Sequence, residues 1–458
     1  MLSKEGPALA TGDVNGDGLP DIYLGGAIGQ TGQLLLQTAN GDFAPTSVEI
    51  FMQYKNSEDI SAVFFDADGD QDLDLYVVSG GNEFKNGDER LQDRLFINGN
   101  GNWTDGTQQL PILRSVGSCV KPADYDQDGD LDLFVGTRVI PNFYGNPPKS
   151  FLLQNQGDGT FKDLTVKQFP DLRKLGMVTD AEWTDLENDG SIELVVTGEW
   201  MPIKVFSFQA DRFVEQDFPA FQQNNGWWYS LEIADLNGDQ NPDIIAGNLG
   251  LNAMFKASES EPFEMYVKDF DQNGSIEQIF VNYRDGQPNP IALRNELGKQ
   301  LTAIKKKFVD FKSYADKSLY QVFTKEELEG ADHFQVRSFE SQVFLNQGSD
   351  FKAIVLPEAA QRSPIRAIIS ADVDEDGNTD LIIGGNFSYA KPEIGRYAAS
   401  YGLTLKGNGD GTFTVLNSGE SGIQCRGDIR GMTTWAQEGQ MHVLIARNND
   451  HPMLYSTK

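Results

Sequence analysis

The stretch Asp124-Tyr-Asp126-Gln-Asp128-Gly-Asp-Leu-Asp132 decides the fold, because it is the cleanest of seven copies of one acidic loop of nine residues. Oxygen-bearing side chains stand at loop positions 1, 3, 5 and 9, and alternate residues of a tight loop point inward. Ca²⁺ accepts roughly six to eight oxygen ligands at about 2.3–2.6 Å. The spacing therefore predicts a calcium site in the loop.

The predicted metal ligands are the four oxygen-bearing residues of each copy. They are Asp13, Asn15, Asp17 and Asp21; Asp66, Asp68, Asp70 and Asp74; Asp124, Asp126, Asp128 and Asp132; Asp185, Glu187, Asp189 and Glu193; Asp235, Asn237, Asp239 and Asp243; Asp269, Asp271, Asn273 and Glu277; and Asp372, Asp374, Asp376 and Asp380. Position 6 is glycine in five copies. Gln71 and Gln240 fill it in the other two, so we expect these two loops to turn differently.

A single copy would also fit a plain Asp-Gly hairpin turn. Seven copies favour metal binding instead, since each would otherwise hold carboxylates that repel one another at close range. The sequence therefore predicts up to seven bound Ca²⁺ ions.

Short apolar strands flank each loop, as at residues 60–65 before Asp66 and 73–78 after it, which predicts a buried β-hairpin. A second hairpin follows in the same repeat, for example over residues 151–161 and 401–413. Four strands per repeat are typical of one propeller blade.

The repeat spacing predicts the domain organisation. The first five loops start 50 to 61 residues apart, but the loop at Asp269 follows after only 34 residues. We therefore expect an insertion over residues 262–338 in the fifth blade, with an extra calcium hairpin and with helix at residues 292–311. Asp372 opens the sixth blade, and a hairpin without metal residues forms the seventh, which the N-terminal residues complete. The predicted fold is all-β: residues 1–458 form a single seven-bladed β-propeller of four-stranded blades, with calcium-binding hairpins between the first two strands and a partly helical insertion.

The two hairpins together resemble a known repeat. Asp-x-Asp-x-Asp-Gly-x-x-Asp followed by Asn-x-Gly-Asp-Gly-Thr-Phe is similar to the FG-GAP or VCBS repeat of integrin α-subunit propellers and of many bacterial surface proteins. Residues 139–144, 247–252 and 395–402 resemble the bacterial branch similar to cartilage acidic proteins. The resemblance implies a calcium-binding recognition, adhesion or scaffold module within a larger exported protein or assembly.

The ligand surface is expected on the face opposite the calcium loops, where the chain leaves each second strand. The candidate ligand-binding residues there are Arg138, Tyr144, Glu199, Trp200, Asn248, Asn252, Asn386, Arg396, Tyr397 and Arg447. Arginine, asparagine and aromatic side chains suit a glycan or a carboxylate-bearing ligand. The alternative is that these residues cap strand ends by bonding the backbone.

Composition limits the partners and the location. The net charge is −31, from 68 acidic and 37 basic residues, which argues against nucleic acid. No apolar run is long enough to predict a membrane span, and the N-terminus lacks the apolar core of a signal peptide. Because such calcium sites suit the high calcium found outside the cytosol, we expect an extracellular, periplasmic or cell-surface protein with an unknown protein or glycan partner.

Catalysis is the less favoured reading, and no catalytic residue is predicted. The three histidines, His333, His442 and His451, accompany no nucleophile motif. The alternative is a calcium-assisted polysaccharide lyase that acts on uronic-acid glycans, with a tyrosine or lysine base and an arginine clamp. Cys119 and Cys425 precede strands of different repeats and are expected to be free thiols.

Overall fold

The computed structural model describes residues 4–391, 394–437 and 439–456, which form antiparallel β-sheets with short helices between them. Seven sheets follow one another along the chain, each a meander that starts with an inner strand. The first three sheets are β1–β4 (Leu9–Gly12, Asp21–Leu24, Gln33–Gln37, Phe43–Thr46), β5–β8 (Glu58–Phe65, Asp74–Gly80, Arg94–Gly99, Asn102–Asp105) and β9–β12 (Val116–Ala123, Asp132–Val139, Phe151–Asn155, Phe161–Asp163). The fourth sheet is β13–β16 (Met177–Thr184, Glu193–Met201, Lys204–Gln209, Arg212–Gln216), with β17 (Gly226–Trp227) beside β14, and the fifth is β18, β19, β24 and β25 (Ser230–Ala234, Asp243–Gly247, Gln342–Asn346, Phe351–Val355). The last two sheets are β26–β29 (Ile365–Ala371, Asp380–Gly385, Leu403–Gly407, Phe413–Leu416) and β30–β32 (Asp428–Gln437, Gln440–Asn448, Met453–Ser456).

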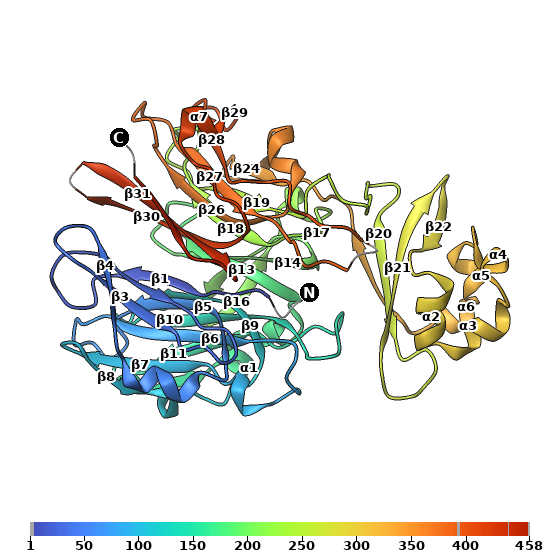
Figure 1. Cartoon of the computed structure of the whole chain (residues 1–458), viewed down its shortest axis with the longest axis horizontal. Coiled ribbons are helices and arrows are strands. Elements are labelled where there is room, and N and C mark those ends of the chain that lie inside the picture. Colours follow the sequence, from blue (N-terminus) through green and yellow to red (C-terminus); the bar gives the residue numbers. More distant parts are fainter. Residues whose placement is uncertain (1–3, 392–393, 438, 457–458) are drawn as a thin grey trace.

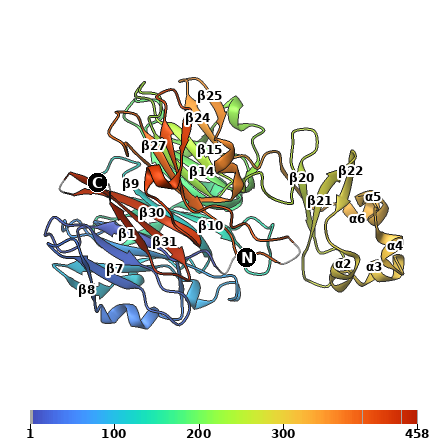
Figure 2. The ribbon, with the colours of Figure 1, turned by 45° about the horizontal axis from the view of Figure 1, so that its top comes forward.

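The seven sheets close into a ring. Their first strands contact one another in the order β1, β5, β9, β13, β18, β26 and β30, and β30 contacts β1 again. Figures 1 and 2 show the sheets around a common axis, with the first sheets in blue and the last in red. The predicted all-β propeller is confirmed.

The core lies between neighbouring sheets. Tyr76 and Leu95 of the second sheet pack against Leu133 and Phe151 of the third, and all four side chains are buried. Every residue of β10 is buried, because a sheet inside the ring is covered on both faces. This explains the nearly continuous apolar runs that follow the acidic loops.

The last sheet closes the ring in an unexpected way. Within the described residues it has three strands, β30, β31 and β32, and β1 belongs to the first sheet. The prediction that N-terminal residues complete the last blade is therefore wrong. The reason is that the first acidic loop starts at Asp13, so the strand before it must pair with β2. We call the contact between the first and last sheets the seam. Side chains hold it: Thr11 Oγ1 lies 3.0 Å from Thr433 Oγ1.

The insertion forms an eighth sheet beside the ring, and Figure 1 shows that it projects from one side of the ring. Its strands β22, β21, β20 and β23 span Gln287–Pro290, Glu277–Arg284, Phe263–Lys268 and Asp332–Val336 in sheet order. Its helices are α2 (Arg294–Gln300), α3 (Thr302–Lys307), α4 (Phe311–Tyr314), α5 (Leu319–Val322) and α6 (Lys325–Leu328). The helical spacing at residues 292–311 thus yields two short helices, because Leu301 adopts an extended backbone between them.

The other helical segments are short connections between strands. They are α1 (Thr165–Gln168), α7 (Ser418–Ser421) and the 3₁₀ turns η1 (Glu49–Tyr54), η2 (Glu89–Leu91), η3 (Thr107–Gln109), η4 (Pro170–Lys174), η5 (Pro219–Phe221) and η6 (Glu358–Arg362). Of the helices in the described ranges, none has the length and apolar character needed to cross a bilayer.

Candidate functional site

The seven acidic loops share one backbone conformation. In each of them φ is positive at positions 4 and 6, a left-handed conformation that favours glycine. Gln71 and Gln240 adopt φ values of 73° and 69°, in the same region as the glycines of the other loops. The expectation that these two loops turn differently is wrong. The first aspartate holds the turn in both, since Gln71 N donates to Asp66 Oδ2 at 2.9 Å and Gln240 N to Asp235 Oδ2 at 2.9 Å.

The first and last carboxylates of a loop organise it. In the third loop, Asp124 accepts hydrogen bonds from the backbone N–H groups of Asp128 and Gly129 at 3.0 and 3.1 Å. In the second loop, Asp74 accepts from Ala67 N at 2.8 Å and from Asn98 N at 2.7 Å. Because Asn98 lies on β7, the carboxylate at position 9 ties the loop to the third strand of its sheet.

These position-9 carboxylates lie in surroundings that disfavour their negative charge. Burial, together with the other acids of the same loop, raises the pKa of Asp132 to about 8, against the opposing effect of a backbone N–H donor. Burial likewise raises the pKa of Asp74 to about 7 and that of Asp243 to about 6. A cation in the loop would favour the charged form.

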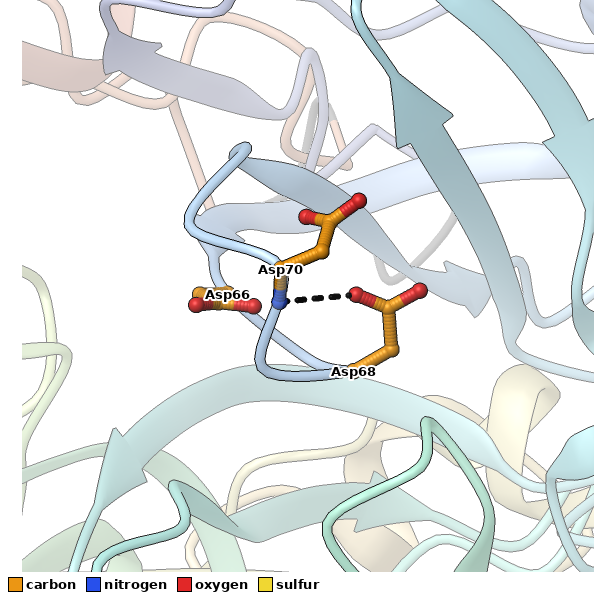
Figure 3. Close-up of side chains that lie close together, drawn as sticks. All are labelled: Asp66, Asp68 and Asp70. Atoms are coloured by element: carbon orange, nitrogen blue, oxygen red, sulfur yellow. Dashed lines mark hydrogen bonds between the residues drawn. The ribbon is translucent and has the colours of Figure 1, made fainter.

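In four loops, three carboxylates each place one oxygen within 4.8 Å of the other two. These groups are Asp66, Asp68 and Asp70 (Figure 3); Asp124, Asp126 and Asp128; Asp269, Asp271 and Glu277; and Asp372, Asp374 and Asp380. In the third loop, Asp126 Oδ1 and Asp132 Oδ2 are buried without a hydrogen-bond partner, so both atoms have free acceptor capacity. This donor set fits a hard cation such as Ca²⁺.

The seventh loop, which starts at Asp372, differs because it already contains a positive charge. The ammonium of Lys406, on β28, contacts Asp374 and lies 2.7 Å from Asp376 Oδ2. In the third loop the third strand instead supplies Gln154, which donates to Asp126 Oδ2 at 3.0 Å. A cation in the seventh loop would therefore compete with Lys406 for the same carboxylates.

On the opposite face, four of the predicted ligand-binding residues form one network. Arg138 Nη2 lies 2.5 Å from Glu199 Oε1, Tyr144 Oη donates to Glu199 Oε2 at 2.8 Å, and Trp200 Nε1 donates to Tyr144 Oη at 2.8 Å. The Trp200 ring is buried and stacks on Phe263 of the insertion, with ring centroids 5.2 Å apart. Trp200 thus packs the insertion against the ring.

The asparagines among the predicted ligand-binding residues bond the backbone. Asn248 is fully buried and donates to Ser338 O and Glu340 O, both at 3.1 Å. Asn386 donates to two backbone carbonyls at 2.7 Å, and Asn252 donates to Arg362 O at 3.1 Å. These contacts are the strand-end capping that the sequence left open as an alternative.

The remaining predicted residues are Arg447, Tyr397 and Arg396, of which Tyr397 packs in the same buried cluster as Trp200. Arg447 donates to the carbonyls of Arg426 and His451 and lies 2.8 Å from the Asp450 carboxylate. Tyr397 is buried and its backbone pairs with Phe387. Arg396 is exposed.

A cavity of about 410 Å³ follows the axis of the ring and is lined by the first strands of all seven sheets. Three residues at its mouth, Glu5, Arg366 and Arg430, were missed by the sequence reasoning. A weak signal exists, because Ile365-Arg366 and Ile429-Arg430 occupy the same place in two repeats. Each arginine is the extra residue of a β-bulge, which aims its side chain toward the axis.

A family model described as FG-GAP-like repeat matches residues 13–77 and 185–246. No curated protein matches the chain. Among solved structures, the V. cholerae biofilm matrix protein Bap1 is similar with a TM-score of 0.40 and 11% identity, over 98% of this chain and 85% of that chain. BBS1N, in a complex with ARL6DN, has a TM-score of 0.45 and 8% identity, over 100% and 93%. The Dos1 propeller has a TM-score of 0.40 and 11% identity, over 100% and 94%. The chain is therefore a β-propeller, and two of its regions, residues 13–77 and 185–246, match the FG-GAP-like repeat.

Proposed function

We propose that this chain is a calcium-stabilised recognition or scaffold module. FG-GAP-like repeats on a propeller suggest such a module, and the carboxylate clusters carry the calcium part of the proposal. Four loops gather acidic oxygens within 4.8 Å, and the third loop adds two buried carboxylate oxygens that have no hydrogen-bond partner. In that loop Asp124, Asp126, Asp128 and Asp132 would hold the ion. Bound Ca²⁺ would neutralise carboxylates that otherwise repel one another.

The location and the partner follow from the same chemistry. Loops of this kind suit the calcium levels found outside the cytosol, so we place the module in the extracellular space, in the periplasm or on the cell surface. Its ligand face is the one opposite the calcium loops. The partner is a protein or glycan, and the module acts as part of a larger exported protein or assembly.

The direct test is calorimetric titration of chelator-stripped protein with Ca²⁺. Asp128→Asn should remove one site, because it weakens one of the four clusters. Asp130→Asn is the matched control, since Asp130 lies in the same loop but outside that cluster. It should leave the number of sites unchanged. Equal stoichiometry in the wild type and Asp128→Asn would contradict the assignment of this loop.

Thermal melting gives a second readout. Four sites at a free Ca²⁺ concentration 100 times the Kd would contribute about 11 kcal/mol, at about 2.7 kcal/mol per site. Unfolding entropy of about 2.1 cal/mol/K per residue then predicts a rise in Tm of about 10 °C between EDTA and saturating Ca²⁺. An unchanged Tm and no heat of Ca²⁺ binding would overturn the proposal.

A further inference from the structure

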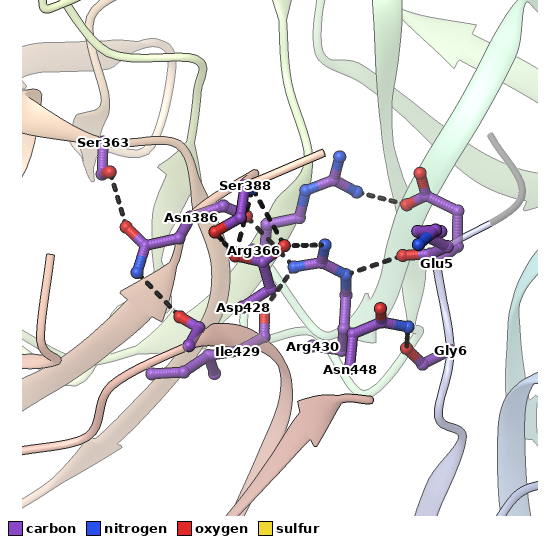
Figure 4. Close-up of polar contacts among 12 residues, drawn as sticks. Glu5, Gly6, Ser363, Arg366, Asn386, Ser388, Asp428, Ile429, Arg430 and Asn448 are labelled. Atoms are coloured by element: carbon purple, nitrogen blue, oxygen red, sulfur yellow. Dashed lines mark hydrogen bonds and ion pairs between the residues drawn. The ribbon is translucent and has the colours of Figure 1, made fainter. Parts of the chain in front are cut away.

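A short arm, residues 4–7, lies across the mouth of the axial cavity and places the carboxylate of Glu5 among arginines (Figure 4). Arg138 Nη1 lies 2.7 Å from Glu5 Oε2, and Arg366 pairs with the same oxygen. Arg430 lies beside them and lowers the pKa of Glu5. The exposed side-chain fraction is 11% for Glu5, 8% for Arg138, 9% for Arg366 and 2% for Arg430. Glu5 therefore occupies a nearly closed cationic pocket.

The charges of this pocket balance only when Glu5 is present. Arg138 also pairs with Glu199 at 2.5 Å, and Arg430 pairs with Asp428 at 3.4 Å. Among the described residues, Glu5 is the one carboxylate that forms an ion pair with Arg366. Without Glu5, the pocket would hold three guanidinium groups against two carboxylates. An unpaired buried charge is costly, so the empty pocket would favour another anion.

The pocket is chemically matched to a carboxylate. Burial raises the pKa of Glu5, but Arg138, Arg366 and Arg430 together lower it to about 2. The Arg366 guanidinium lies over the Tyr229 ring, 4.1 Å from its centroid, which fixes the orientation of its N–H groups. The Nε atoms of Arg138 and Arg366 are buried without a hydrogen-bond partner, so the pocket has donor capacity that Glu5 does not use.

Besides the ion pairs of Glu5, the arm is held by Lys4, which lies over the Tyr389 ring at 3.6 Å, and by two hydrogen bonds to its backbone. Asn448 Nδ2 donates to Gly6 O at 2.7 Å, and Arg430 Nε donates to Lys4 O at 3.1 Å. The arm belongs to no sheet, since β1 begins at Leu9. Its displacement would break no strand pairing. The arm can thus leave while the arginines, which are anchored on β10, β26 and β30, stay in position.

We propose that this pocket is a carboxylate-binding site that Glu5 occupies in cis, and that a ligand carrying a carboxylate group binds there by displacing the arm. The cavity behind the pocket, about 410 Å³, falls within the range of small-molecule sites. A sugar acid and the carboxylate of a small acylated amino acid share the required group. This proposal deepens the proposed function and rests on it for the choice of ligand face.

Chemical rescue tests the proposal in the whole 458-residue chain, saturated with Ca²⁺. Glu5→Ala should lower the Tm, and sodium acetate should restore most of the loss in a saturable way. Sodium chloride at equal ionic strength should not. Glu215→Ala is the matched control, because Glu215 forms a surface ion pair with Lys204 at 2.8 Å. Acetate should not rescue this variant. Adding Arg366→Gln to Glu5→Ala should abolish the rescue. If Glu5→Ala does not fold, Glu5→Ser, whose short polar side chain also leaves the carboxylate position open, takes its place in the same titration.

Competing ligands then separate the sources of the carboxylate. Glucuronate that rescues Glu5→Ala at lower concentration than acetate supports a sugar acid, and N-acetylglycine that does so supports an acylated amino acid. Glucose should have no effect. Acetate that raises the Tm of Glu5→Ala and Glu215→Ala equally, or of neither, overturns the proposal. A normal Ca²⁺ titration without acetate rescue refutes only this pocket, whereas rescue without Ca²⁺ binding refutes only the calcium proposal.

Discussion

Replacing Gln71 with glycine should stabilise the protein, because the native backbone at this position favours glycine. Gln71 has φ of 73°, and its side chain is exposed. The left-handed conformation costs a residue with a Cβ about 1–2 kcal/mol, while glycine loses about 0.5–1 kcal/mol more backbone entropy on folding. The net gain is about 0.5–1 kcal/mol, since glycine keeps the N–H donor to Asp66 Oδ2.

Urea denaturation of the chelator-stripped protein measures this gain as a higher midpoint at an unchanged m value. Gly129→Ala is the converse control at position 6 of another loop. An added Cβ at Gly129 would meet no atom within 4 Å, so the loss of about 1 kcal/mol would come from the backbone alone. A lower midpoint for Gln71→Gly, or an unchanged midpoint for Gly129→Ala, would refute the reasoning.

Three further outcomes follow from buried titratable groups. Burial raises the pKa of Glu5, but Arg138 and the two other arginines lower it more, to about 2. The ion pairs of Glu5 therefore stabilise the fold above about pH 4.5, and this stability is lost as the pH falls toward 2. Glu5→Gln should remove about 2 kcal/mol of this dependence in urea titrations from pH 3 to 6. Burial, with Glu83 nearby, raises the pKa of Glu58 to about 8, so stability falls as pH rises from about 4.5 toward 8. Glu58→Gln should therefore melt above the wild type at pH 9 and not at pH 5. Burial raises the pKa of Cys119 to about 12, so iodoacetamide at pH 8 should label its thiol only after unfolding in urea.

The sequence predicts the repeated parts of this molecule well. The acidic spacing identifies the hairpin loops, since one chemical requirement places the same residue types in each copy. The apolar runs beside them identify the inner strands of the sheets. The conformation of Gln71 was not predictable from its identity, because the acceptor oxygens of Asp66 hold the turn without glycine.

The cluster of charged residues at the mouth of the axial cavity could not be predicted in the same way, because it forms only after the ring closes. Glu5, Arg138, Arg366 and Arg430 come from distant repeats, and no local pattern shows that they converge. Trp200 is a related case. Its place after a second strand suggested an accessible side chain, but the insertion covers it through Phe263. Contacts between separate repeats and an insertion cannot be read from either segment alone.

The seam has a consequence for how the molecule fluctuates. Neighbouring sheets are separate throughout the ring, but successive sheets are also joined by a connecting loop. In the described chain no such loop joins the first sheet to the last, so the ring closes there through side chains such as Gln37, which donates to Gln437 Oε1 at 2.8 Å. The first and last sheets can therefore move apart without breaking backbone pairing in either sheet. Hydrogen exchange should detect this as a low-energy opening, with the amides that face the seam less protected than those of β9 on the far side of the ring.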